Sequence, residues 1–163
     1  MDSENLVVLL KQLNFSAGLP DNVLTKLAAI ATLCHHPAGA ILFREGCDHN
    51  RLLIITKGRI ALDMRVPGRD EVRILSLGAG DVVAWSALIG NGCMTTSAVA
   101  LEDTQVVSIE ARDLLSLCEA DHTLGYFMMR RIGHALANRL VATRLQLLDL
   151  FSDDPSPIPA GRP

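Results

Sequence analysis

Hydrophobic positions recur at helical spacing at both ends of the chain, whereas the middle follows a shorter period. Near the N-terminus one face of an amphipathic helix is outlined by Leu6, Leu9, Leu10 and Leu13. A second apolar run of helical period follows Pro20 and Asp21, two residue types that favour the start of a helix. The pattern predicts that the first part of the chain, residues 3–36, is helical.

Between residues 37 and 110, short apolar and β-branched runs alternate with glycines. The runs span residues 40–43, 52–56, 60–66, 72–77, 81–85, 97–101 and 105–109. Several short strands separated by turn residues are typical of an antiparallel sandwich or roll. Residues 67–70 read Pro-Gly-Arg-Asp, which is a turn composition. We therefore expect runs 60–66 and 72–77 to form a hairpin.

Residues 111–151 are predicted to be helical again. A short helix covers residues 112–120, and a longer one begins at Asp121, a residue type favoured at the N-cap, and continues to about residue 151. At 1.5 Å per residue the longer helix measures about 45 Å, which is more than a small domain needs.

The long helix is apolar on two sides. One stripe is close to a heptad seam and predicts a homodimer interface made by Met129, Ile132, Leu136, Leu140, Thr143, Leu147 and Leu150. The other stripe is expected to face the domain and comprises Leu124, Phe127, Met128, Ala135 and Leu145. The alternative is a single helix that packs along a groove of its own domain.

Composition narrows the class of protein. The chain has 163 residues, is 49% hydrophobic and carries a net charge of −3. Its length favours one domain, which we place at residues 1–151, followed by a proline-rich tail at 152–163. Mild acidity argues against nonspecific nucleic-acid binding. An acidic N-terminus and the lack of long apolar runs predict neither a secretory signal nor a membrane span, and hence a cytoplasmic protein.

Cysteines and histidines offer one further candidate chemistry. Cys34, Cys47, Cys93 and Cys118 have no CxxC spacing, so reduced thiols are the expected state. Cys34 precedes His35 and His36, but neighbouring residues on a strand alternate faces, so a metal site would need Cys47 or His49 as well. We predict no metal and keep a redox or metal sensor as an alternative. No catalytic triad or carboxylate pair is present, so we do not expect an enzyme.

Four segments in order resemble the cyclic-nucleotide-binding domain of the catabolite-activator (Crp/Fnr) superfamily. They are residues 37–46 (PAGAILFREG), 54–61 (IITKGRIA), 75–82 (LSLGAGDV) and 100–104 (ALEDT). The resemblance implies an α+β fold: an antiparallel β-roll (a jelly roll) with N-terminal helices, a short cassette helix and a long C-terminal dimerisation helix. Residues 80–98 resemble the cassette of a divergent bacterial subgroup of stand-alone domains. Because no helix-turn-helix follows the long helix, we expect no direct DNA binding.

The cassette departs from the family pattern at two positions. The family's Gly-Glu pair, whose Glu binds the ribose, falls at Ala84 and Trp85, and its phosphate-binding Arg falls at Met94. No Arg or Lys occurs between Arg73 and Arg112. Binding of cAMP or cGMP is therefore predicted to be weak or absent, because hydrogen bonds to charged groups contribute about 1.5–3 kcal/mol each.

The resemblance nevertheless implies a set of pocket residues. The backbone N–H groups of residues 86–88 and the hydroxyls after Met94 remain as donors, and Thr143 occupies the long-helix position at which family members touch the adenine. The predicted ligand-binding residues are Ala84, Trp85, Ser86, Ala87, Leu88, Met94, Thr95, Thr96, Ser97 and Thr143.

Besides the redox or metal sensor, two functions remain open. The first is a regulatory sensor that reports small-molecule occupancy of the β-roll to an unidentified protein partner through its dimer helix. In that case Trp85 stacks on a planar group of the ligand. The second is a ligand-free interaction scaffold, in which Trp85 fills the pocket.

Overall fold

The computed structural model describes residues 3–68 and 71–152, and the side chains of residues 4–68 and 71–145. The N-terminal helical elements are α1 (Ser3–Lys11), the 3-10 helix η1 (Asn14–Ser16) and α2 (Asp21–Ile30). The strands are β1 (Ala31–His36), β2 (Ile41–Phe43), β3 (Arg51–Lys57), β4 (Ile60–Arg65), β5 (Glu71–Leu77), β6 (Val82–Val83), β7 (Ser97–Ala100) and β8 (Thr104–Glu110). Helix α3 (Ser86–Ile89) lies between β6 and β7, and α4 (Ala111–Ala120) and α5 (His122–Ser152) follow β8.

The strands form two four-stranded sheets, in the orders β1-β8-β3-β6 and β2-β7-β4-β5. All the described pairings are antiparallel. The pairing of β4 with β5 confirms the hairpin that the turn composition predicted. With the N-terminal helices and the long C-terminal helix, the two sheets confirm the predicted α+β fold built on a β-roll.

Strand β1 corrects the prediction that the N-terminal part is helical as far as residue 36. Helix α2 ends at Ile30, and residues 31–36 pair with β8 from Ala31 opposite Ile109 to His36 opposite Thr104. Thr, Cys and His are weak helix formers, and this segment finds hydrogen-bond partners for its backbone along a neighbouring strand. Local spacing could not indicate that partner, because β8 lies about seventy residues further along the chain.

The β1-β8-β3-β6 sheet separates two hydrophobic clusters, one between the two sheets and one, the helical cluster, between this sheet and the helices. Leu53, Ile55 and Val106 point between the sheets, whereas Leu52, Ile54 and Val107 pack against the helices. Strand β3 is therefore buried on both faces, and this explains its unbroken apolar run where a half-exposed strand would alternate.

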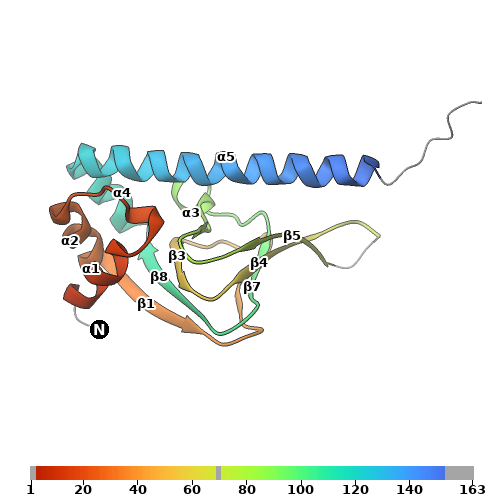
Figure 1. Cartoon of the computed structure of the whole chain (residues 1–163), viewed down its shortest axis with the longest axis horizontal. Helices are drawn as coiled ribbons and strands as arrows, with labels where there is room; N and C mark the ends of the chain where they lie inside the picture. Colours follow the sequence, from red (N-terminus) through yellow and green to blue (C-terminus); the bar gives the residue numbers. More distant parts are fainter. Residues whose placement is uncertain (1–2, 69–70, 153–163) are drawn as a thin grey trace, which may run out of the picture.

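Helix α5 spans both parts of the molecule. Figure 1 shows it along one edge, over the N-terminal helices at its beginning and over the β-roll further on. The helix begins as predicted, because the Asp121 carboxylate accepts a hydrogen bond from the Leu124 N–H at 3.1 Å. Among the described residues, no helix combines the length and the apolar composition needed to cross a bilayer.

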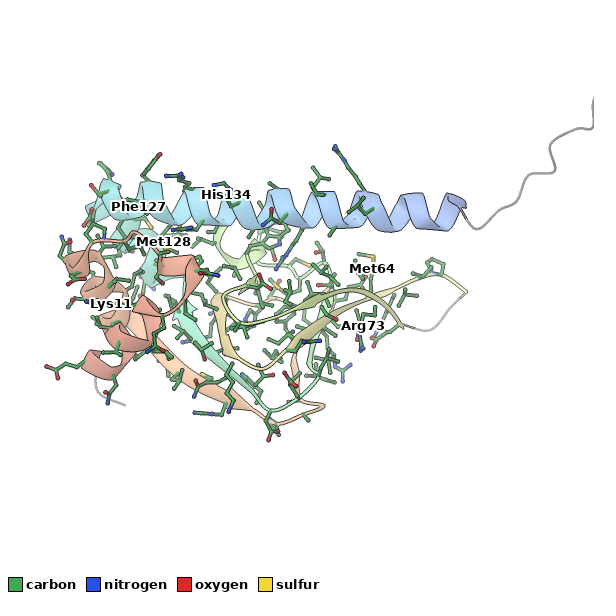
Figure 2. The ribbon with its side chains drawn as sticks, in the orientation of Figure 1. Lys11, Met64, Arg73, Phe127, Met128 and His134 are labelled. Carbon is green, nitrogen blue, oxygen red and sulfur yellow. The ribbon has the colours of Figure 1, made fainter. Side chains whose placement is uncertain are left out.

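The domain-facing side of α5 differs from the prediction at two positions. Ile132 was expected on the dimer seam, but it is 1% exposed and packs with Leu124 and Met128 in the helical cluster; Figure 2 shows Met128 pointing from α5 toward the N-terminal helices. Leu145 was expected to face the domain, but it is 57% exposed. The domain covers one helix face about 100° wide, and the helical repeat places Leu145 outside it.

The other residues of the predicted dimer seam also divide between exposed positions and positions that pack against the domain. Met129 and Leu140 are exposed, whereas Leu136 is half-buried against the helical cluster. Leu147 and Leu150 lie within α5 but outside the residues whose side chains the structure describes.

Candidate functional site

A cavity of about 130 Å³ lies between the β-roll and α5. The roll contributes its strands and the cassette around α3, and α5 closes the other side. The lining residues are Phe43, Leu62, Ile74, Leu75, Ala84, Trp85, Ser86, Met94, Thr95, Thr96, Arg139 and Thr143. Elements that are far apart in the sequence therefore meet around one space.

Seven of the ten predicted pocket residues line this cavity: Ala84, Trp85, Ser86, Met94, Thr95, Thr96 and Thr143. The other three do not. Leu88 belongs to the helical cluster, and Ala87 packs against both hydrophobic clusters. Ser97 is buried, and its hydroxyl accepts a hydrogen bond from the Glu45 N–H at 3.1 Å.

Two of the predicted backbone donors of the cassette are already bonded within it. The N–H groups of Ala87 and Leu88 donate to the carbonyls of Ala84 and Trp85, both at 3.0 Å. This corrects, for residues 87 and 88, the prediction that the N–H groups of residues 86–88 remain as donors for a ligand. Helix α3 has only four residues, so these bonds form its single turn.

Ala84 explains why the family pattern places glycine at this position. Its φ is 60°, and it is the one non-glycine residue with positive φ in the described part of the chain. Glycine adopts this conformation without strain, whereas a Cβ atom makes it unfavourable. The cassette therefore keeps its turn although the glycine is replaced.

Trp85 and Met94 are the residues that the resemblance places at the positions of the family's charged anchors. Met94 is 2% exposed, and its sulfur accepts a hydrogen bond from the Ser86 hydroxyl at 3.5 Å. Trp85 is half-buried, borders the cavity and packs partly against the helical cluster. These two side chains make this end of the cavity apolar.

Arg139 is the residue of the site that the sequence reasoning missed. It was not among the predicted pocket residues, but it lines the cavity, and its guanidinium donates to the Val82 carbonyl, 57 positions away in sequence. Burial lowers the pKa of Arg139 from its usual value. One sequence signal was available: Arg139 lies four residues before Thr143, which was already predicted to face the ligand, and residues four apart share a helix face. In the structure the Thr143 hydroxyl donates to the Arg139 carbonyl at 2.9 Å.

A second cavity, of about 200 Å³, adjoins the first. The two share Leu75 and Arg139 in their linings, and Asp81, Asn138 and Ala142 are among the residues around the second. Small-molecule sites in proteins usually measure about 300–1,000 Å³. The first cavity alone is below that range, and the two together reach its lower end.

The cysteines and histidines do not assemble into a further site. Cys34, Cys47, Cys93 and Cys118 are free thiols. Within residues 3–68 and 71–152, no three His, Cys, Asp or Glu side chains come close enough together to hold a metal ion. The metal-sensor alternative therefore gains no support from the geometry of the described residues.

The fold and the site define a class of ligand-binding regulatory domain. Residues 33–121 match the family of the cyclic nucleotide-binding domain. The chain belongs to this family.

Individual relatives and solved structures of this kind also resemble the chain. The chain is 31% identical over 120 residues to a CRP-like cAMP-activated global transcriptional regulator of Mycobacterium tuberculosis, which covers 73% of this chain and 52% of that protein. The structure of the Thermus thermophilus catabolite activator protein has a TM-score of 0.69 at 25% identity, over 85% of this chain and 62% of that one. A cyclic nucleotide-binding domain from Methylobacillus flagellatus shares the fold, with a TM-score of 0.76 at 19% identity, over 90% of this chain and 83% of that one.

The chain spans about half the length of the curated relatives it matches. What the match covers is the regulatory domain, so membership of the family establishes the fold of a cyclic nucleotide-binding regulatory domain.

Proposed function

We propose that this chain is a regulatory module that binds a small molecule in the β-roll and transmits occupancy through α5. The observation that carries this proposal is the joint lining of the cavity, in which Trp85, Thr95 and Thr96 of the roll face Arg139 and Thr143 of α5. A ligand held there touches both the β-roll and α5. It shifts the position of α5 to the extent that it binds one helix arrangement more tightly than another.

The output surface in this proposal is the exposed face of α5. Met129 and Leu140 are 40% and 54% exposed, and Gly133 and Ala137 lie on the same face between them. An apolar helix face with small residues at its centre allows a second helix to approach closely. We propose that two copies of this chain pair along this face, and that the pair signals to a protein partner.

Cyclic nucleotides are the first ligands to test, although we expect them to bind weakly. The family's ribose-binding Glu and phosphate-binding Arg are absent from the cassette, and Trp85 and Met94 offer no replacement charge. The loss of two charged anchors weakens binding by about two decades or more.

Isothermal titration calorimetry with cAMP and cGMP tests the proposal. A saturable heat with a Kd below about 1 mM, equivalent to about −4 kcal/mol, supports a ligand-sensing module. If no saturable heat appears at millimolar cAMP or cGMP, the cyclic-nucleotide version of the proposal is wrong.

A ligand-free scaffold is the second candidate, and the small cavity favours it. In this case Trp85 and the buried Met94 fill the pocket, and the exposed face of α5 is the working surface. Trp85→Ala then opens a space that nothing occupies, so stability falls by about 3–5 kcal/mol, while ligands have no effect on pairing. Size-exclusion chromatography with light scattering, with and without cAMP, distinguishes the two functions.

A further inference from the structure

The second cavity borders the edge of a sheet rather than its face. Leu75, Ser76 and Leu77 are consecutive residues of β5, and all three line it. Neighbouring side chains on a strand point to opposite faces, so a row of three borders one cavity where the backbone edge itself faces it. Strand β5 is the last of its sheet, and this outer edge pairs with no other strand within residues 3–68 and 71–152. Figure 1 shows β5 on the side of the roll that faces α5.

Helix α5 forms the opposite wall of this cavity, largely with small side chains. Ala135, Asn138, Arg139 and Ala142 line it, at the spacing i, i+3, i+4 and i+7 that places residues on one helix face. The two alanines end at Cβ, so the helix leaves room beside the strand edge. The Asn138 carboxamide is exposed and has no hydrogen-bond partner in the described part of the chain. It offers both donors and an acceptor to a backbone that lies in this space.

A third cavity, of about 180 Å³, continues this space along α5 toward the N-terminal helices. It shares Asp81, Val82, Ala135 and Asn138 with the second cavity and adds Arg131 to the lining. We call the joined second and third cavities the edge slot. A long space with a strand edge on one side and a helix on the other has the shape of an extended polypeptide.

Cations outnumber anions around the edge slot. Arg131 and Arg139 line it, and each donates to one backbone carbonyl. None of the ion pairs among the described residues includes either arginine. Asp81 is the one carboxylate in the described lining, and it accepts a hydrogen bond from the Gly78 N–H at 2.8 Å. A guanidinium presents five donors, so both arginines keep donors that a carboxylate matches.

We propose that the edge slot binds an extended, acidic segment of a partner protein, which adds to β5 as a further strand. One edge of the segment pairs with the β5 backbone, the other faces Asn138, and its carboxylates reach Arg131 and Arg139. Main-chain hydrogen bonds supply the affinity in this mode of recognition. A second copy of this chain does not fit, because its β5 is joined to its own β4 and the slot admits a single chain. The inference concerns a partner, so it stands whether or not the β-roll cavity binds a small molecule.

The probe is a library of random twelve-residue peptides displayed on phage and selected on the full chain. Fluorescence anisotropy then measures the affinity of the enriched peptides for the wild type, Ala142→Phe, Arg131→Gln and Arg144→Gln. Ala142→Phe fills the slot, and Arg144→Gln is the matched control, because Arg144 is also an arginine of α5 but lines neither cavity of the slot. Thermal melts confirm that each variant is folded. Peptides N-methylated at alternate residues test the backbone pairing without any change to the protein.

We expect the enriched peptides to carry Asp or Glu and to lack proline at their centre, because proline removes a main-chain donor. Ala142→Phe and N-methylation of the peptide should each weaken binding by about tenfold or more, since the first blocks the slot and the second removes hydrogen bonds. Arg131→Gln should weaken binding by about threefold to tenfold, the effect of losing a partly exposed charged partner. Arg144→Gln should bind like the wild type.

Several results would overturn the inference. If no peptide is enriched on the wild type, or if Ala142→Phe binds the peptides as tightly, the edge slot is not a docking site. If N-methylated peptides bind unchanged, the segment does not add to β5 as a strand. Enriched peptides without acidic residues, or equal affinities of Arg131→Gln and Arg144→Gln, would refute the charge assignment. If a peptide halves the mass of a dimer in light scattering, copies of this chain occupy the slot instead of a partner.

Discussion

Ala84 carries conformational strain that its sequence neighbours do not reveal. Its φ of 60° lies in the left-handed region, and its side chain is 6% exposed. A non-glycine residue there loses about 1–2 kcal/mol relative to glycine. Burial of its methyl group contributes about 0.8 kcal/mol to the free energy of unfolding, so the alanine is only slightly less favourable than glycine.

Substitutions at Ala84 should follow this balance. We expect Ala84→Gly to raise the free energy of unfolding by about 0–1 kcal/mol, because strain relief slightly exceeds the lost burial. Ala84→Val should lower it by more than about 2 kcal/mol, because a β-branched side chain fits this backbone poorly. Urea denaturation measures both. A glycine variant less stable than the valine variant would contradict the assigned conformation.

His49 provides a second prediction at the residue scale. Its ring lies against that of Phe43, with 5.0 Å between centroids, and its buried Nε2 has no hydrogen-bond partner in the described structure. Burial lowers the pKa of His49 from 6.5. The folded state therefore disfavours protonation, and the unfolded state binds more protons as the pH falls below 6.5.

Stability should consequently fall as the pH is lowered from about 7.5 to about 5.5, and His49→Gln should reduce this slope. His36, whose pKa burial also lowers, contributes with the same sign, so the slope should flatten without vanishing. Urea denaturation of both proteins at several pH values measures the difference. Identical slopes would show that His49 titrates normally in the folded protein.

At the scale of the element, helix α5 illustrates what an apolar period can and cannot assign. The two predicted stripes contain the residues that pack, but Ile132 and Leu145 exchange roles: the first is buried in the domain and the second is exposed. Helical spacing defines faces relative to one another. Which face meets the domain depends on how α5 is rotated over the core, and Leu124 and Met128 fix that rotation by packing in the helical cluster.

Truncation at these two positions tests the assignment. Ile132→Ala should lower the free energy of unfolding by about 2–5 kcal/mol, because it leaves a cavity in the core. Leu145→Ala should change it by less than about 0.5 kcal/mol. Chemical denaturation followed by circular dichroism measures both, and equal losses would contradict the rotation of α5 described above.

At the scale of the whole molecule, the exposed face of α5 decides whether two copies pair. We expect Leu140→Lys to convert a dimer into a monomer, because it places a charge in the middle of the proposed apolar interface. Val8→Lys is the matched control, since Val8 is 56% exposed, like Leu140 at 54%, but lies on α1. Light scattering measures both masses. A mass that Leu140→Lys leaves unchanged would refute this interface.

The sequence by itself determined the class of fold. Glycine-punctuated apolar runs predicted the strands to within one or two residues at most ends, because turns and side-chain burial are local properties of the chain. The quoted segments indicated the family, and seven cavity residues followed from them. Strand β1 was missed because its stability comes from pairing with a distant strand.

Only the tertiary structure decided the charge of the site. A search of the sequence around the cassette finds no cation, but folding places α5 over the roll and brings Arg139 to the carbonyl of Val82. Non-local contacts of this kind depend on the relative placement of whole elements, which the packing of α5 on the core fixes and no local pattern encodes. Helical spacing placed Arg139 on the same face as Thr143, but its contact with the roll was decided only when these elements were assembled.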